Sequence, residues 1–487
     1  YRGWEKQKFV DDSIMWDENP LYGWIEKNPK PDGTKYDIYT DGLKIHTTID
    51  SRMQRYAEEA VVKHMGSLQK AFFREKRGAR NAPYTSNWEE LGKVKVESLI
   101  QHAIKQTERY RVMKLAGATE EEINRAFTTP REMDVFSYEG VVDTVMTPRD
   151  SLLYQKHFLR TGFMSMDPRN GHVKAYVGGP NFTFFQYDMA ATGRRQIGST
   201  IKPFLYTYAM EEGFTPCDML SNTQPVFTDE SGRTWAPRNA GSARVGEMVD
   251  LRWALTNSNN WISARLMGQL SPTTLVRNMH NFGITNHLDP VMSICLGSCE
   301  VSIREMVGAY TAYANNGMRA APVYVSSISD ANGNVISEFN TTHTEVISET
   351  AYAKILSMLM NVVDGGTGNR VRRAPYNITA QMGGKTGTTN YNADGWFMGF
   401  TPDLVSGVWV GGEERYIHFN TMAHGQGAAM ALPIYGLYMS KVYADPTLPY
   451  SQNSTFNVDF SHLCDKEFYD YVEESDTVEE SISDVFD

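Results

Sequence analysis

The N-terminal part of the chain combines one short alternating segment with a long helical pattern. Residues 42–50, GLKIHTTID, alternate apolar and polar side chains, which predicts a short strand. Asp50 or Ser51 can then cap a helix. Beyond this cap, helical sequence continues to about residue 127 and includes TEEEINRAF, whose first and fourth residues form a capping box. The apolar stripe of the first helix consists of Met53, Tyr56, Ala60, Val61 and Met65.

Strand patterns replace the helical one near residue 163. The segments GFMSMD and HVKAYVGG are joined by PRNG, whose turn-forming residues predict a β-hairpin. Residues 199–365 have a mainly helical pattern, and strand-like runs follow around GGKTGT, WFMGF and LVSGVWVGG. Because TPD alone joins the last two runs, they are expected to be antiparallel neighbours. The pattern predicts an α+β fold, with an antiparallel sheet of about five strands covered by helices and an additional helical lobe.

Composition divides the chain into four expected regions. An extended lead-in covers 1–45, a mainly helical linker or accessory region 46–160, the main domain 161–445, and an acidic tail 446–487. The formal net charge is −11, and ten acidic residues with one lysine between 465 and 487 contribute −9 of it. Such a run predicts a solvated, disordered tail. The acidic balance also argues against a nucleic-acid partner.

The cysteines and histidines give no sign of a metal site or of another cofactor. Cys217, Cys295, Cys299 and Cys464 are too few for a disulfide scaffold. Cys295 and Cys299 lack further ligands at metal spacing, so we predict packing thiols, although the sequence leaves open whether they pair. The eleven histidines contain no H-E-x-x-H motif. No run of about 18 apolar residues is present, and because the chain begins at Tyr1 we expect a fragment or a processed product. The full-length protein is expected to be membrane-anchored through a segment absent from this chain.

The first of three chemical motifs is STIK, from Ser199 to Lys202. Gly198 precedes it and Pro203 follows it. Because proline is tolerated only in the first helical turn, a helix must begin close to Ser199, with free backbone N–H groups beside the hydroxyl. Lys202 then lies one turn later on the same face, where it can serve as the base that a serine nucleophile needs. The alternative is that Ser199 is only a helix cap.

Context separates informative copies of these short motifs from accidental ones. A second S-x-x-K, from Ser67 to Lys70, lies inside the long amphipathic helix, so its serine is predicted to be an ordinary surface hydroxyl. The second chemical motif, SNN from Ser258 to Asn260, lies between two helical segments. A hydroxyl and an amide in such a loop can relay a proton and hold a substrate amide.

The third motif, KTGT from Lys385 to Thr388, is the most informative. Side chains alternate along a strand, so Thr386 and Thr388 share one face, where two hydroxyls and a nearby lysine suit a substrate carboxylate. Gly387 keeps the strand slim enough for an extended peptide to lie against it. The alternative is an ordinary lysine at a strand end. The three motifs in this order are the signature of penicillin-binding proteins and class A β-lactamases.

At the level of whole segments, the sequence resembles the transpeptidase region of a class A, bifunctional penicillin-binding protein. The likeness spans roughly residues 160–415 and includes RRQIGSTIKPFLY, CLGSCEVSIREMVGAYTAYANNGM, VVDGGTGNRV and GGKTGTTNYNADGWFMGFTPDLVSGVWVGG. The earlier segment DGLKIHTTIDSRMQRYAEEAVVKHM resembles the connection between glycosyltransferase and transpeptidase. No glycosyltransferase catalytic motif is found, so that half is missing from this sequence, which leaves open whether such a domain precedes it in the natural protein.

The resemblance implies a serine D,D-transpeptidase that cross-links peptidoglycan stem peptides. In that family pattern Ser199 attacks the penultimate D-alanine carbonyl and Lys202 takes its proton. Ser258 passes a proton to the leaving D-alanine, and Lys385 supports Ser258 electrostatically. Asn260 holds the substrate amide and orients Lys202.

The resemblance also implies how substrate and inhibitors bind. Thr386 and Thr388 bind the terminal carboxylate, and the backbone N–H groups of Ser199 and Thr388 form an oxyanion hole. An amine from a second stem peptide completes the cross-link, while β-lactams acylate the same serine. The expected location is the extracytoplasmic, periplasmic face of a bacterial inner membrane.

Two other functions use the same motifs. A D,D-carboxypeptidase or β-lactamase replaces the amine by water, and a β-lactam sensor acylates without turnover. The middle motif is Ser-Asn-Asn instead of the Ser-Asp-Asn usual in class A β-lactamases, and no Glu-x-x-Leu-Asn lies between it and Lys385. Both points favour the transpeptidase.

Overall fold

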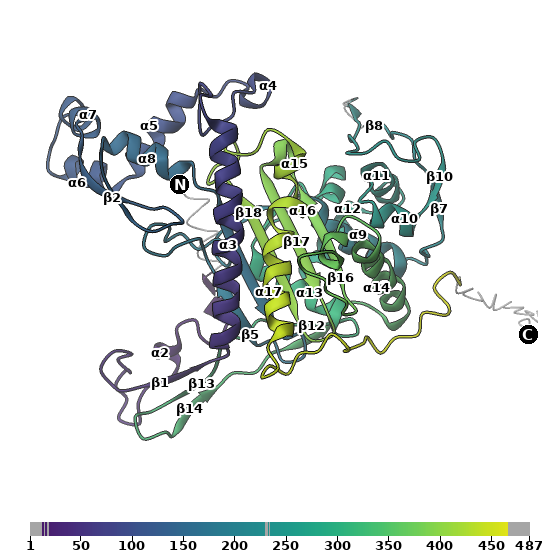
Figure 1. Cartoon of the computed structure of the whole chain (residues 1–487). Helices are drawn as coiled ribbons and strands as arrows, with labels where there is room; N and C mark the ends of the chain where they lie inside the picture. Colours follow the sequence, from purple (N-terminus) through teal and green to yellow (C-terminus); the bar gives the residue numbers. More distant parts are fainter. Residues whose placement is uncertain (1–11, 14, 17–18, 229–231, 233, 466–487) are drawn as a thin grey trace, which may run out of the picture.

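A five-stranded antiparallel sheet forms the centre of the computed structural model (Figure 1). The structure describes residues 12–13, 15–16, 19–228, 232 and 234–465. The early hairpin and the late meander meet where β18 pairs with β4, which confirms the sheet expected from the sequence. The strand order is β16-β17-β18-β4-β5, so β16 lies at an edge. The strands are β4 (Arg160–Met166), β5 (Val173–Val177), β16 (Gly383–Thr388), β17 (Asp394–Phe400) and β18 (Val405–Gly411).

Helices cover both faces of this sheet, which explains why every residue of β4, β17 and β18 is buried. On one face lie α3 (Ser51–Lys76) and α17 (Leu432–Ala444), side by side in Figure 1. On the other face α13 (Ile303–Ala314) packs against β4, β17 and β18. Neighbouring residues of a strand therefore enter different cores: Phe163 belongs to the α17 side and Met164 to the α13 side.

A helical lobe surrounds α13 and is buried against the same face of the sheet. Its first helix, α9, is buried on every side from Lys202 to Met210, as expected for a helix at the centre of a domain. The helices of this lobe are α9 (Lys202–Glu211), α10 (Leu251–Thr256), α11 (Asn260–Met267), α12 (Pro272–Asn281) and α14 (Glu349–Asp364).

Short ribbons and turns connect these elements. They are β6 (Arg195–Gln196) with β11 (Glu300–Val301), β7 (Met219–Ser221) with β10 (Met248–Asp250), β8 (Phe227–Thr228) with β9 (Thr234–Trp235), and β12 (Met318–Ala320) with β15 (His343–Glu345). The short helices α15 (Met422–Gly425) and α16 (Gly427–Met430) precede α17.

The strand predicted within 42–50 is present as β1 (Lys44–Thr47), and it pairs with β13 (Val325–Ser329) of the later sequence. Strand β14 (Val335–Glu338) completes this small sheet, and α2 (Trp24–Lys27) packs nearby through Trp24. The side chain of Asp50 then caps α3 by accepting from two backbone N–H groups, as the sequence predicted. The lead-in is thus attached to the main domain.

Between α3 and β4 the chain is mainly helical and contains one β-hairpin. The predicted capping box, Thr119 with Glu122, is present at the start of α7. The elements are α4 (Trp88–Leu91), α5 (Val96–Gln106), α6 (Glu108–Leu115), α7 (Glu120–Thr128), β2 (Arg131–Val135), β3 (Val142–Met146) and α8 (Pro148–Lys156).

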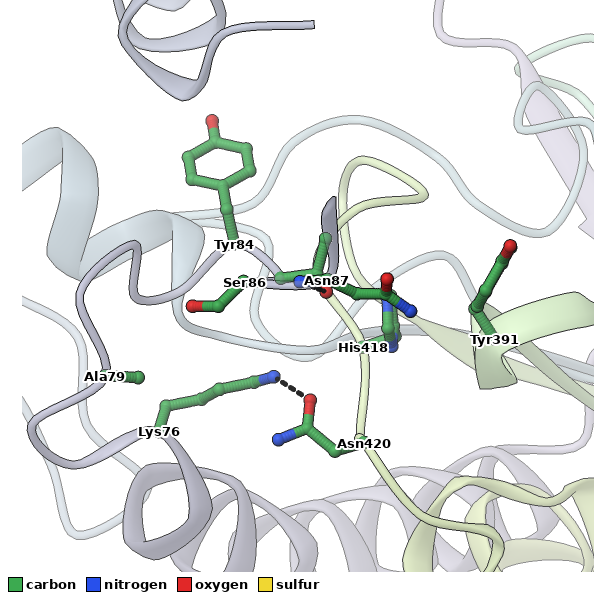
Figure 2. Close-up of a pocket in the computed structure, with 9 residues that line it drawn as sticks. Lys76, Ala79, Tyr84, Ser86, Asn87, Tyr391, His418 and Asn420 are labelled. Atoms are coloured by element: carbon green, nitrogen blue, oxygen red, sulfur yellow. Dashed lines mark hydrogen bonds between the residues drawn. The ribbon is translucent and has the colours of Figure 1, made fainter. Parts of the chain in front are cut away.

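Polar contacts join this helical region to the main domain. At the end of α3, Lys76 is almost fully buried and donates to Asn420 Oδ1 at 3.0 Å, and both residues line the cavity that Figure 2 shows. His418, which also lines this cavity, contacts both carboxylate oxygens of Glu90 at 2.8 Å through Nε2. The region from 80 to 159 is therefore held against the segment that follows β18.

The described part of the C-terminal segment, residues 446–465, differs from the disordered tail that we expected. Tyr450 and Phe456 are buried, and Phe456 N donates to Gln381 Oε1 at 2.9 Å. Cys464 forms a disulfide with Cys217, with 5.6 Å between the Cα atoms. The tail prediction failed here because the acidic run begins only at 465, whereas the preceding residues carry aromatic side chains that pack. The prediction for 466–487 lies outside the described residues.

The other two cysteines agree with the sequence-based expectation. Cys295 and Cys299 are buried, free thiols. In the described part of the chain, no helix is both long enough and apolar enough to cross a membrane.

Candidate active site

Ser199 lies where the structure turns into α9. It belongs to the 3₁₀ turn η1 (Gly198–Ile201), which continues directly into α9, with Pro203 in the first helical turn. This confirms the predicted helix start. Ser199 is not a cap, because it lies inside the turn and the cap position is occupied by Ile197. Ser199 is half-buried, and its Oγ makes no hydrogen bond to any of the residues that the structure describes, so the hydroxyl is available to a ligand.

Lys202 joins the first motif to the second. Its side chain is fully buried, and Nζ donates to Ser258 O at 2.6 Å and to Asn260 Oδ1 at 2.7 Å. A longer contact of 3.3 Å reaches Ser258 Oγ. Burial lowers the pKa of Lys202 well below its usual value, and the positive charge of Lys385 lowers it further. The neutral amine, which can accept a proton, is therefore far more populated than in an exposed lysine.

The second motif forms the turn between α10 and α11, as the sequence predicted. Ser258 has a φ of +54°, a left-handed conformation that is unusual for a residue other than glycine and that aims its carbonyl and its hydroxyl at Lys202. Asn259 has a structural role, because its side chain caps α11 by accepting a hydrogen bond from Ile262 N. Asn260 also donates through Nδ2 to Arg238 O at 2.8 Å.

Lys385 approaches the same hydroxyl from the sheet. Its Nζ donates to Ser258 Oγ at 2.8 Å and to Thr386 O at 3.0 Å, and the side chain is fully buried. Burial lowers the pKa of Lys385 to about 7. The Ser258 hydroxyl is therefore flanked by two lysines that each release a proton readily, and mutual repulsion disfavours the state in which both are charged.

The backbone of β16 offers an open edge to a ligand. Thr389 N donates to Asp394 O of β17 at 3.2 Å, so the backbone N–H of Thr389 points toward β17. In an antiparallel ladder, hydrogen-bonded and non-hydrogen-bonded pairs alternate. The register Thr388↔Gly395 and Thr386↔Phe397 therefore turns the N–H and C=O groups of both threonines away from β17, toward the free edge beside η1.

The hydroxyl groups of the third motif are partly engaged within the protein. Thr386 Oγ1 donates to Thr367 Oγ1 at 2.7 Å, and Thr388 Oγ1 accepts from Gly427 N at 3.0 Å. Thr367 was not identified from the sequence, although it lies in VVDGGTGNRV directly after α14, where clustered glycines signal a tight backbone approach. It adds a third hydroxyl beside the two predicted threonines.

The structure explains the glycine at position 387 differently from the sequence-based expectation. A Cβ at this position would lie 2.8 Å from Ile197 O and 2.9 Å from Thr200 Cγ2. The space beside the glycine is thus filled by the nucleophile's own turn, which packs directly on β16. The glycine places Ser199 close to the end of the strand instead of leaving room for a bound peptide at this point.

Family models match two parts of the chain. A model described as the penicillin binding protein transpeptidase domain matches residues 161–412, and one described as the penicillin-binding protein middle domain matches residues 80–159. All three motifs lie within the first match.

Relatives of known sequence carry the same family name. Penicillin-binding protein 2D of Bacillus subtilis is 34% identical over 308 residues, which cover 61% of this chain and 43% of the relative. Penicillin-binding protein 1A of Rickettsia bellii is 30% identical over 459 residues, 86% of this chain and 56% of the relative. The chain thus spans about half the length of these relatives.

Solved structures share the fold. Penicillin-binding protein 1A of Haemophilus influenzae superposes with a TM-score of 0.63 at 19% identity, over 91% of this chain and 70% of the other. The PonA1 protein of Mycobacterium tuberculosis, in complex with penicillin V, gives a TM-score of 0.57 at 21% identity, over 86% and 89%. The matched domain covers more than half of the sequence, and the chain belongs to the penicillin-binding protein transpeptidase family, with the transpeptidase and middle domains of a class A member.

Proposed function

We propose that the chain is a serine D,D-transpeptidase that forms an acyl-enzyme on Ser199 and cross-links peptidoglycan stem peptides. The observation that carries the proposal is the half-buried Ser258 hydroxyl, held at 2.8 Å from Lys385 Nζ and 3.3 Å from Lys202 Nζ. This pair of buried lysines with lowered pKa values supplies the base and the proton relay that acyl transfer requires.

In the acylation step, the neutral amine of Lys202 accepts the Ser199 proton while Oγ attacks the penultimate D-alanine carbonyl. The oxyanion that forms accepts hydrogen bonds from the backbone N–H groups of Ser199 and Thr388, one at the start of a helix and one at the open edge of β16. The C–N bond then breaks, and the leaving D-alanine amine takes a proton from Ser258. Ser258 is reprotonated from Lys202, so proton and electron pairs balance.

Binding of the donor uses its terminal carboxylate. Thr388 donates to it through its hydroxyl, and Thr386 does so once its proton turns from Thr367 Oγ1 to the carboxylate. Both hydrogen bonds are strong because the acceptor is charged. Lys385 adds positive charge behind them. Asn260, which fixes Lys202, also offers its amide to the peptide. The complex of the PonA1 protein with penicillin V supports a second part of the proposal, that β-lactams acylate Ser199 in this chain.

The proposed location is the extracytoplasmic side of a bacterial inner membrane. The Cys217–Cys464 disulfide supports it, because structural disulfides persist in oxidising compartments such as the periplasm.

A product assay tests the proposed reaction against its alternatives. The protein is incubated with a pentapeptide ending in D-Ala-D-Ala, with and without a D-amino acid as amine acceptor, and products are separated by mass. We expect a new amide that contains the acceptor. Release of D-alanine with hydrolysis alone, at any acceptor concentration, would identify a carboxypeptidase. A stable adduct with no product would identify a sensor, and deacylation of bound penicillin within seconds would identify a β-lactamase.

A further inference from the structure

The segment that carries Ser199 is tied to the sheet by an ion pair outside the three motifs. Arg195, in β6, lies four residues before Ser199, and its Nε donates to Asp394 Oδ1 at 2.8 Å. The guanidinium stacks on the Trp409 ring at 4.7 Å, and Nη1 donates to Glu413 O at 3.1 Å. Three contacts thus fix the guanidinium of Arg195, a planar group whose N–H donors and faces suit several contacts at once.

Asp394 collects contacts from several strands while being almost fully buried. Besides Arg195, its Oδ1 accepts from Trp409 Nε1 at 3.0 Å, and its Oδ2 accepts from Thr389 Oγ1 at 2.9 Å. Asp394 N also donates to Thr389 Oγ1 at 3.0 Å. A single carboxylate thus holds the end of β16, the start of β17, the far end of β18 and the approach to η1.

This carboxylate connects the two backbone groups on which the proposed oxyanion hole depends. Thr389 directly follows Thr388, and Arg195 leads into Ser199. A second tie runs parallel to the first, from Trp396 Nε1 to Gln196 O at 2.8 Å. These contacts touch neither the nucleophile nor the carboxylate-binding threonines, and they add to the direct packing of η1 on β16 in setting the distance between the Ser199 turn and the end of β16.

We propose that Asp394 and Arg195 are positioning residues for acylation: together they hold the Ser199 turn and the Thr388 end of β16 at the separation that the oxyanion requires. The inference rests on the proposed function, because it presumes that Ser199 is acylated. Loss of the pair displaces one N–H group relative to the other, and displacements of about 1 Å cost on the order of 10²-fold in rate. Thr388 is next to this network, but Thr386 and Lys385 lie farther along β16 and outside it, so initial binding should change less than the acylation rate.

The experiment separates binding from acylation with penicillin V as the probe. Stopped-flow saturation curves give the dissociation constant of the initial complex and the first-order acylation rate for the parent, Asp394→Asn, Arg195→Ala and Arg195→Lys. We expect the acylation rate to fall about 10- to 100-fold in the first two variants, with the dissociation constant within about threefold of the parent. Arg195→Lys, which keeps the charge but not the fork, should recover part of the rate.

Asp167→Asn is the matched control. Asp167 is also almost fully buried and also holds an arginine, accepting from Arg169 Nε at 3.2 Å, but it follows β4 at the opposite end of the sheet. We expect it to lower the melting temperature while leaving acylation at the parent rate. The double variant Arg195→Ala/Asp394→Asn should be no slower than the slower single variant, because both changes break one contact.

Two results would overturn the positioning role. One is a parent-like acylation rate in folded Asp394→Asn and Arg195→Ala, with only the melting temperature lowered. The other is an equal loss of rate in Asp167→Asn. If the parent itself forms no adduct on Ser199, the proposed function fails, and this result is distinguishable because it is seen before any variant is made.

Discussion

Replacing Lys202 by arginine keeps a positive charge in the site but removes the proposed base. In the parent, Nζ is fully buried and donates to Ser258 O and Asn260 Oδ1. A cation that served only to bind or to orient these groups would be replaced in part by a guanidinium. A group that must accept the Ser199 proton would not, since arginine does not deprotonate in proteins.

The size of the effect follows from the protonation state of the lysine. A free lysine with a pKa of ~10.4 is neutral in only about 4 molecules in 10,000 at pH 7. Burial and the charge of Lys385 lower the pKa of Lys202, and each unit of lowering raises the neutral fraction tenfold. Positioned general bases contribute on the order of 10²–10⁴-fold to rate. We therefore expect Lys202→Arg to acylate about 10²–10⁴-fold more slowly than the parent.

The assay is the rate of covalent labelling by penicillin V, measured from pH 6 to pH 10. For the parent, the rate should rise with pH along a curve whose midpoint lies well below ~10.4, because only the deprotonated amine is active. Lys202→Met, which fits the buried space without charge, is the control for the larger arginine side chain, and both should be slow while melting cooperatively. Acylation of Lys202→Arg within about threefold of the parent would refute the assignment of the base.

Three other predictions follow from the same contacts. The free energy of unfolding should rise between pH 7 and about pH 10, because the pKa of Lys385 is about 7 in the folded protein but ~10.4 in the unfolded chain. Urea titrations of Lys385→Met should show a smaller rise than the parent, and an unchanged rise would contradict this. Thr386→Val should lower kcat/KM more for donors with a free C-terminal carboxylate than for amidated donors, and equal losses would remove the carboxylate role. Breaking the Cys217–Cys464 disulfide by Cys217→Ser should cost about 2–5 kcal/mol of stability, because the bond links residues 247 apart; a melting curve that is insensitive to this change would show that the C-terminal segment is not held by it.

Local patterns accounted for most of the fold. Alternation predicted the strands of the hairpin and the meander, and apolar spacing predicted α3, because each depends on residues that are neighbours in sequence. The helix start at Ser199 was predicted from Pro203 alone, for the same reason. The capping box at Thr119 was equally local.

What the sequence did not predict depends on pairs that are distant in the chain. The Cys217–Cys464 bond spans 247 residues, and no spacing rule connects two cysteines across such a loop. The contact between Arg195 and Asp394 spans 199 residues and only exists because β6 packs beside β17. For Gly387, sequence reasoning found a residue that needs close approach but could not tell that Ile197 fills the space.

The most direct test is the intact mass of the protein after incubation with penicillin V, followed by peptide mapping of the adduct. We expect one adduct per chain, located on Ser199, and its loss in Ser199→Ala. Ser67→Ala, which removes an exposed hydroxyl in the middle of α3 within the other S-x-x-K, should label like the parent. An adduct that persists in Ser199→Ala, or that maps to another residue, would contradict Ser199 as the nucleophile.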